Sequence, residues 1–319
     1  MNAVKECKLL ELNNRLPQPI DYLFFSASFE ERAYGICEQL WKGCSKRFLC
    51  FNKNHLVYLQ ESVNRFKSIV ENPTTVSFDS DFPLEIFNAF RDAIEQIKNQ
   101  RPCHVGVDIT CFTREALSIL YFLLRHELPK GSVITAFYQR AMQYGRSRKG
   151  GWLTEGVREV RTILGYSGTV SLSADTHLII VPGFEYERAQ EIVDAVQPSR
   201  ISLGHAIAEK NVSPELNLDH ESFLAKLQAL YLGPSFDHFE FACLDPFKTR
   251  DSVLKLVEYS SNRNLIVACL NTKLAMLGVC LAALTNRSIQ LVYAQPISYN
   301  TKSYSEPSGE VVSFTIPVS

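Results

Sequence analysis

The feature of this chain that most constrains its fold is an internal repeat. A motif, Ser-Phe-Glu-Glu-Arg-Ala at residues 28–33, returns as Gly-Phe-Glu-Tyr-Glu-Arg-Ala at residues 183–189. Two further segments recur in the same order and at a similar separation: residues 108–117 with 268–276, and Tyr138 and Tyr144 with Tyr293 and Tyr299. Three ordered matches separated by about half of the chain predict two related domains rather than a solenoid of short repeats.

The composition is that of a compact protein with two domains of ordinary size. The chain has 319 residues, of which 46% are hydrophobic and 21% charged, and its formal net charge is −1. This charge gives no general attraction to a long nucleic acid, and no apolar run reaches the roughly 20 residues of a membrane-spanning helix. The first residues lack the pattern of a signal peptide, so we expect a cytoplasmic protein. The nine cysteines and seven histidines lack ligand spacing, so we expect no metal, disulfide framework or cofactor.

Apolar strands alternate with helices in both halves. The predicted strands are 22–26, 47–51, 75–78, 104–109 and 133–138, then 177–181, 200–203, 239–243, 265–270 and 289–293. Strands separated by helices of this length predict α/β units with parallel sheets and right-handed crossovers. We therefore expect two tandem Rossmann-like units, each a doubly wound, mainly parallel five-strand sheet, related by internal duplication. The organisation of residues 205–238 is not defined by the pattern.

The domain boundaries follow from a glycine-rich basic segment in the middle of the chain. Residues 145–151 read Gly-Arg-Ser-Arg-Lys-Gly-Gly, which is typical of a flexible joint. The stretch after it predicts a connecting helix at 154–163. We expect an N-terminal unit at 1–145, the joint and connecting helix at 146–172, and a C-terminal unit at 173–319.

The candidate site lies where ligands bind in open parallel sheets. They bind beyond the carboxyl ends of the strands, where the strand order reverses, and the first and fourth strands of each unit flank that position. The repeated motifs follow those strands and open helices, whose free N–H groups and dipole favour anions such as phosphate. The candidate ligand-binding residues are Ser28, Arg32, Thr110, Thr113, Arg114, Arg188, Asn271, Thr272 and Lys273.

A purely structural interpretation of the same residues stays open. Serine, threonine and asparagine are preferred helix N-caps, so the polar residues suit the start of a helix without any ligand. Arg32 and Arg188 suit ion pairs with Glu30 or Glu31 and with Glu187, or contacts with the neighbouring unit. The chain has neither a G-x-G-x-x-G motif nor a phosphate loop ending in Gly-Lys-Ser/Thr, so a standard dinucleotide or nucleoside-triphosphate site is not indicated.

Asp108 is the isolated candidate for acid or base catalysis, because it ends a buried strand at the expected ligand edge. Its counterpart in the second half is Ala268. An aspartate at a strand end more often caps a turn than catalyses, and no G-x-S-x-G motif is present. The sequence therefore favours a binding protein over an enzyme.

The segment after the fourth strand resembles that of CRISPR-associated Rossmann fold (CARF) domains, where the strand is followed by Thr-Gly-Gly-Thr-Lys and an apolar helix. Thr110, Thr113-Arg114 and Thr272-Lys273 match this pattern, while Cys111-Phe112 and Leu270-Asn271 replace the glycines. Two such units in one chain look like the SAVED sensors of prokaryotic antiviral defence, which are similar to fused CARF dimers. In both groups a cyclic oligonucleotide sits across the paired units and switches an effector. The resemblance implies ligand contacts with Ser28, Thr113, Arg114, Thr272 and Lys273.

We therefore expect a nucleotide-ligand or effector-protein binding module, a sensor or accessory subunit of a bacterial antiviral defence or stress system. No effector domain remains once two units are counted, so a sensor would act through a partner protein. Two alternatives stay open. One is a nucleotide-processing enzyme, a cyclic-oligonucleotide phosphodiesterase or glycosidase, that uses Asp108 or Glu31 at the same cleft. The other is a ligand-free scaffold subunit of a defence complex.

Overall fold

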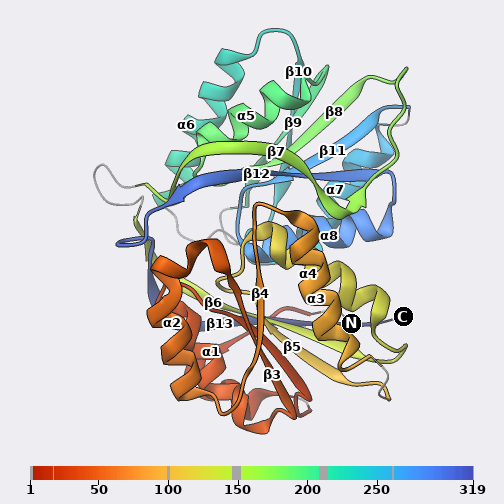
Figure 1. Ribbon diagram of the computed structural model, residues 1–319. Helices are drawn as coiled ribbons and strands as arrows, with labels where there is room; N and C mark the ends of the chain where they lie inside the picture. The colour runs from red at the N-terminus through yellow and green to blue at the C-terminus, as the bar shows by residue number, and fades with distance from the viewer. Residues whose placement is uncertain are drawn as a thin grey trace. The chain divides into compact units, whose positions relative to one another are not determined.

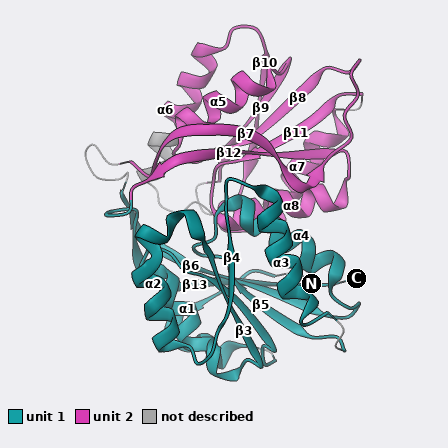
Figure 2. Ribbon diagram, viewed as in Figure 1, with its two compact units in different colours: residues 1–145, 301–319 teal, residues 146–300 magenta. Residues whose placement is uncertain are grey.

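The computed structural model describes residues 3–16, 18–98, 101–145, 152–207, 215–260 and 262–318, with the backbone alone for residues 215–220. The chain forms two compact units (Figure 2). The first contains residues 1–145 and 301–319, and the second contains residues 146–300.

The first unit is built on a seven-stranded sheet with the order β1-β13-β6-β5-β2-β3-β4 (Figure 1). Five neighbouring strands are parallel; β13 pairs with β6 in antiparallel orientation, and β1 pairs with β13 in antiparallel orientation. The strands are β1 (Lys5–Lys8), β2 (Tyr22–Ser26), β3 (Lys46–Asn52), β4 (Thr74–Phe78), β5 (His104–Asp108), β6 (Val133–Tyr144) and β13 (Ser305–Pro317). The helices are η1 (Leu9–Arg15), α1 (Arg32–Leu40), η2 (Trp41–Gly43), η3 (Lys53–His55), α2 (Leu56–Ile69), α3 (Pro83–Glu95) and α4 (Arg114–Glu127).

The second unit has a six-stranded sheet with the order β10-β9-β8-β11-β12-β7. Five of its strands are parallel, and β7 is antiparallel to β12. The strands are β7 (Thr154–Ser167), β8 (Thr176–Val181), β9 (Arg200–Ala206), β10 (Ser235–Phe241), β11 (Asn264–Cys269) and β12 (Ile289–Tyr299). The helices are α5 (Tyr186–Val196), α6 (Glu215–Leu230), α7 (Pro246–Glu258) and α8 (Lys273–Thr285).

The apolar spacing that predicts the helices produces a core on the sheet in each unit. In the first, Ile36 and Cys37 of α1 and Phe66 of α2 are buried in one cluster with Phe25 of β2. In the second, Ile192 of α5 and Leu227 of α6 are buried with Ile180 of β8. The burial of these side chains fixes which face of each helix packs on the strands and therefore where the helix N-termini lie.

The two units exchange their antiparallel strands. The chain leaves the first unit after β6, and the next strand, β7, pairs with β12 in the second sheet, where Thr162 lies opposite Val292. The chain leaves the second unit after β12, and β13 pairs with β6 in the first sheet, where Val312 lies opposite Tyr138. Each sheet is therefore completed by a strand that follows the last parallel strand of the other unit. We call β7 and β13 the exchanged strands.

The exchange corrects the predicted domain boundaries. The sequence predicts a second domain at 173–319 after a joint at 146–172, but residues 301–319 belong to the first unit and residues 154–167 form β7 of the second sheet. Residues 146–151 of the joint lie outside the described residues. Strand pairing between segments far apart in the sequence overrides the order of the chain, and a boundary drawn from composition does not reveal it.

β7 also replaces the predicted helix at 154–163. The charged residues of this stretch have a helix-like spacing, but its β-branched residues suit a long edge strand, and Gly156 adopts φ +66° beside a register shift. The prediction of two α/β units is confirmed. The predicted count of five strands per sheet is wrong, because the exchanged strands and β1 extend the sheets to seven and six strands.

Candidate functional site

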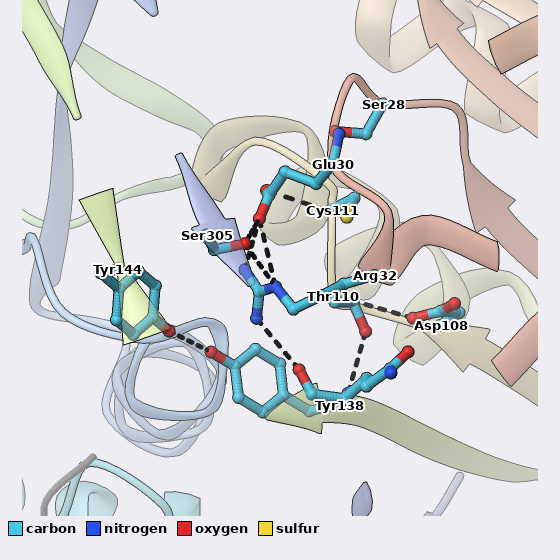
Figure 3. A network of polar contacts seen from close by, with 10 residues as sticks. Ser28, Glu30, Arg32, Asp108, Thr110, Cys111, Tyr138, Tyr144 and Ser305 are labelled. Atoms are coloured by element: carbon cyan, nitrogen blue, oxygen red, sulfur yellow. Dashed lines mark hydrogen bonds and ion pairs between the residues drawn. The ribbon is translucent and has the colours of Figure 1, made fainter. Parts of the chain in front are cut away.

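The carboxyl edge of the first sheet is organised around Arg32, the first residue of α1 (Figure 3). Its Nη2 atom lies 2.6 Å from Oε2 of Glu30, and its Nη1 atom donates to the carbonyl oxygen of Gln139 at 3.0 Å. Its Nε atom donates to Oγ of Ser305 at 2.8 Å, and this hydroxyl in turn donates to Glu30. Arg32 and Glu30 are only 3% and 7% exposed. The guanidinium therefore joins α1 to β6 and to the exchanged strand β13.

Two tyrosines complete the surroundings of this guanidinium. The Cζ atom of Arg32 lies 5.8 Å from the ring centre of Tyr138 and 5.6 Å from that of Tyr144, and the two hydroxyls are 3.0 Å apart. Burial acts to lower the pKa of Arg32, but the charge of Glu30 outweighs it and holds the pKa well above its ordinary value. Burial raises the pKa of Tyr144 well above its usual range. The charged guanidinium of Arg32 is thus enclosed by Glu30 and by the rings of Tyr138 and Tyr144. A ligand would reach it only by replacing these contacts.

The second unit contains the same arrangement around Arg188. Its Nη1 atom lies 2.7 Å from Oε2 of Glu185, and Nη2 and Nε donate to the carbonyl oxygen of Ala294 at 2.6 and 3.0 Å. The guanidinium lies 5.3 Å from the ring centre of Tyr293. Thr154, the first residue of β7, donates its hydroxyl to Glu185. In each unit, then, the carboxylate of a buried Glu–Arg pair accepts a hydrogen bond from the hydroxyl group of the first residue of the exchanged strand.

The repeated sequence motif therefore encodes a structural feature that occurs twice. Arg32 forms an ion pair with Glu30, as the structural interpretation anticipates, whereas Arg188 pairs with Glu185 and not with Glu187. Sequence reasoning missed Glu185 as the partner of Arg188, although the glutamate of the motif recurs with the arginine. It also missed Ser305 and Thr154, because nothing local marks the first residue of a strand that pairs with a distant segment.

Asp108 is the last residue of β5, and Thr110 follows it in the loop before α4. The backbone N–H of Thr110 donates to Oδ1 of Asp108 at 3.0 Å, and Oγ1 of Thr110 accepts from the backbone N–H of Gln139 at 3.0 Å. Burial raises the pKa of Asp108 to about 7, against the hydrogen bonds from Thr110 and the charge of Arg32. Both residues are almost fully buried. The carboxyl group of Asp108 therefore holds the turn that leads to Thr110. It lacks the exposure that a catalytic acid needs to contact a substrate.

The hydroxyl and amide candidates at this edge make local hydrogen bonds in both units. Oγ of Ser28 accepts from the N–H of Glu30 at 3.1 Å. Thr113 and Thr272 are the N-caps of α4 and α8, and each accepts an N–H three residues later, at 3.2 and 3.1 Å. Asn271 donates to the carbonyl oxygen of Pro182 at 2.6 Å. These side chains hold the loops and helix starts in place, as capping residues do.

Arg114 and Lys273 occupy equivalent positions in the two units. Each is the first residue of its helix, directly after the capping threonine, and each is partly exposed at the carboxyl edge of its sheet. A cation in the first turn of a helix opposes the helix dipole, typically by 0.3–1 kcal/mol. Two cations at positions where the dipole disfavours them therefore stand out as candidates for an anionic partner.

The crevice between the first and fourth strands is closed in the second unit. A Cβ atom added to Gly183, in the loop after β8, would lie 2.0 Å from the carbonyl oxygen of Leu270, in the loop after β11. The N–H of Leu270 donates to the carbonyl oxygen of Val181 at 2.8 Å. The two loops thus touch through their backbones at the place where many open α/β sheets bind a ligand.

Apolar side chains are exposed on two neighbouring loops of the first unit. Val57 and Tyr58 start α2, and Phe82 and Leu84 start α3; they are 89%, 59%, 59% and 65% exposed. The loops before these helices are joined by a hydrogen bond from Nδ2 of Asn52 to Ser80 at 2.6 Å and by an ion pair between Lys53 and Glu85 at 2.6 Å. We call Val57, Tyr58, Phe82 and Leu84 the apolar edge cluster.

The described part of the chain has neither a cluster of metal-ligand side chains nor a membrane-spanning helix. No three His, Cys, Asp or Glu side chains among the described residues lie close enough together to hold a metal ion. None of the described helices is both long and apolar enough to cross a lipid bilayer.

The comparisons with known proteins leave the family open. No family model and no curated protein matches the chain. Among solved structures, an S-adenosylmethionine-dependent methyltransferase from Clostridium acetobutylicum ATCC 824 matches at 15% identity and a TM-score of 0.25, over 47% of this chain and 54% of that protein. The N-domain with NADP of a bacterial malonyl-CoA reductase matches at 9% identity and a TM-score of 0.27, over 85% and 79%. The chain spans about half of the length of that methyltransferase, and at TM-scores of this size neither neighbour bears on function.

Proposed function

We propose that this chain is a binding module of two tandem CARF-like units, related by internal duplication, which contacts an effector protein in a bacterial antiviral defence or stress system. It works in the cytoplasm as an accessory subunit and without a cofactor. The apolar edge cluster is the observation that carries this proposal. The resemblance of residues 108–114 to the CARF motif supports the assignment to defence.

The apolar edge cluster brings together four exposed apolar side chains at the starts of two helices. Single exposed apolar side chains are normal, whereas several on adjoining loops form a patch typical of protein interaction sites. The polar groups of the same edge are engaged within the unit: Arg32 in its ion pair, and Ser28 and Thr113 in turn and cap hydrogen bonds. At this edge the exposed apolar side chains therefore lie among paired charges, a combination that suits a protein surface.

The test is complex formation with the product of a neighbouring gene, measured by size-exclusion chromatography with light scattering. A Tyr58→Ser/Phe82→Ser variant should lose the complex because two aromatic contacts are removed. The matched control is Leu172→Ser/Leu232→Ser, which replaces two exposed apolar side chains of the second unit. A complex that survives the first pair of substitutions, or that both pairs weaken equally, contradicts the proposal.

A nucleotide-type ligand, including a cyclic oligonucleotide, is the second candidate, and the paired positions of Arg114 and Lys273 favour it. Thermal shift with cyclic oligonucleotides tests it, since a ligand that binds only the folded state raises the melting temperature. Arg114→Ala and Lys273→Ala should each reduce the shift, and Lys302→Ala, a substitution outside both helix starts, should not. A nucleotide-processing enzyme has less support, because Asp108 is buried and Glu31 pairs with Arg65 at 2.9 Å.

A further inference from the structure

A second candidate site lies in the first unit, away from the carboxyl edge. A cavity of about 560 Å³ is bounded on one side by β6, β13 and β1 and on the other by η1. The strand register places Thr135 of β6 opposite Thr315 of β13, and Ser313 of β13 between Phe137 of β6 and Lys5 of β1. Hydroxyl, aromatic and ammonium groups therefore share one face of three adjacent strands. The volume falls within the roughly 300–1,000 Å³ of small-molecule sites.

Buried His104 fixes the direction of the hydrogen bonds at the floor of this cavity. Its Nδ1 atom lies 2.9 Å from the carbonyl oxygen of Pro19, which only accepts, so Nδ1 carries the proton. Burial lowers the pKa of His104, so the ring is neutral at pH 7 and its Nε2 atom accepts from Thr135 at 2.7 Å. Thr135 then accepts from Thr315, whose Oγ1 atom is 2.9 Å away. Because Thr315 has used its only proton, its oxygen offers an acceptor to the cavity.

Charged side chains of both signs lie on the exposed side of the cavity. Lys5 and Arg15 contribute two cations to the lining and Glu6 contributes one carboxylate. The side chain of Arg15 is 66% exposed and pairs with Glu11 at 3.1 Å. An exposed pair of this kind contributes little to stability and rearranges readily for a ligand. Lys5 and Arg15, once Arg15 leaves Glu11, can pair with an anionic group, while Thr315 offers an acceptor to a donor deeper in the cavity.

We propose that this cavity binds a small hydroxylated anion of mononucleotide size. The phosphate pairs with Lys5 and Arg15, a sugar hydroxyl donates to Thr315, and the base packs against the partly exposed side chain of Leu16. The site shares no residue with the carboxyl edge, so the two proposals fail independently.

Isothermal titration of adenosine 5′-monophosphate into the full chain at pH 7 tests the proposal. We expect one saturable site per chain, with tighter binding than either adenosine or inorganic phosphate gives alone. Lys5→Ala and Thr315→Val should each weaken binding about tenfold or more, since each removes a contact with a charged or hydrogen-bonding group. Thr315→Ser keeps the hydroxyl and should restore binding.

Lys8→Ala is the matched control. Lys8 lies on the same strand as Lys5, at a position whose side chain points to the other face, and it does not line the cavity. Its replacement should leave the affinity unchanged. No saturable binding at millimolar nucleotide, equal weakening by Lys8→Ala and Lys5→Ala, or undiminished binding by Thr315→Val would each overturn the proposal.

Discussion

Ser305 and Glu30 lie 275 positions apart in the sequence, yet the hydroxyl of Ser305 donates a hydrogen bond to the carboxylate of Glu30. The equivalent bond in the second unit runs from Thr154 to Glu185. Each hydroxyl belongs to the first residue of an exchanged strand, and each carboxylate is paired with a buried arginine. The repeated motif thus supplies, in each unit, the glutamate that binds the first residue of the exchanged strand.

Arg32→Met should destabilise the chain strongly. It leaves Glu30 as a buried charge without its arginine, and breaking a buried ion pair in this way costs about 3–5 kcal/mol. Lys53→Met breaks the exposed pair with Glu85 and should leave the stability close to that of the parent chain. Urea unfolding monitored by circular dichroism compares the two. Similar midpoints for the two variants would show that the buried pair contributes little.

Removal of residues 301–319 should disturb the first unit rather than the second, to which those residues are nearer in the sequence. β13 pairs with β6 along most of its length, and its loss exposes β6 and frees Glu30 from Ser305. Hydrogen exchange should therefore lose protection in β6 and α1 and keep it in β8 and β11. Loss of protection confined to the second unit would contradict the strand exchange.

Asp108→Asn should stabilise the chain at alkaline pH. The pKa of Asp108 is about 7 in the folded chain and 3.8 in the unfolded chain. Between pH 3.8 and pH 7, therefore, the folded chain keeps a proton on this carboxyl group that the unfolded chain has released. The contribution of Asp108 to stability is therefore full below pH 3.8 and is lost as the pH rises through 7. Asparagine stays neutral and can still accept from Thr110. The gain at pH 8 should reach up to about 4 kcal/mol and vanish near pH 4.

Denaturant midpoints at a series of pH values measure this effect. Asp92→Asn, a substitution of an exposed residue on α3, is the control and should leave the curve unchanged. A constant difference between Asp108→Asn and the parent chain at all pH values would exclude the raised pKa.

His177 should make the chain sensitive to acid. Its ring bridges the Ser260 and Ser202 hydroxyls at 2.7 Å each, and burial, assisted by the charge of Arg200, lowers its pKa to about 4. The unfolded chain takes up a proton near pH 6.5, so the contribution of this group to stability is full above that value and is lost as the pH falls toward 4. The loss should be up to about 3 kcal/mol.

The measurement is the free energy of unfolding of His177→Gln between pH 4 and pH 7. Glutamine does not titrate, so the variant should be less stable at neutral pH but show a flatter acid limb. His126→Gln, at an exposed position, should keep the slope of the parent chain. An acid limb that His177→Gln leaves unaltered would assign the sensitivity to other groups.

Gly183→Ala should destabilise the second unit, because its Cβ would lie 2.0 Å from the backbone oxygen of Leu270 and would force two loops apart. Overpacking of this kind costs about 1–3 kcal/mol. Gly233→Ala is the matched control, since nothing lies within 4 Å of the added Cβ. Melting temperatures compare them. A drop for the first and none for the second would support a closed crevice, and two unchanged values would indicate that space remains there.

Local patterns predicted the parallel part of each sheet well. Apolar runs such as 104–109 and 265–270 became β5 and β11, and the structural interpretation of Thr113 as a helix cap is confirmed, because capping is decided within three residues. In the second unit the cap is Thr272 and not its neighbour Asn271. Long-range pairing was not predictable in this way. Nothing in residues 154–163 or 305–317 indicates which sheet they join, and the charged spacing of the first segment favoured a helix over the strand that tertiary pairing selected.

The sequence predicted where the residues of the candidate site lie better than it predicted which groups they contact. The sequence placed Arg32, Thr110 and Asp108 at one edge, and the structure has them there (Figure 3). Their partners could not be foreseen, since Ser305 and Gln139 reach them from strands far along the chain. The cavity beside η1 gave no signal, because its lining comes from the two ends of the chain and from β6.

The strand exchange has a consequence for synthesis of the protein. Strands β1 to β6 of the first unit are translated before the second unit, but their sheet lacks β13 until the strands of the second unit have been made. At translation rates of about 5–20 residues per second, the segment between β6 and β13 takes about 8–30 seconds, during which β6 remains an open edge. The second unit receives β7 early and gains its last strand, β12, before β13 is made. The half that is translated first is thus the half that is finished last.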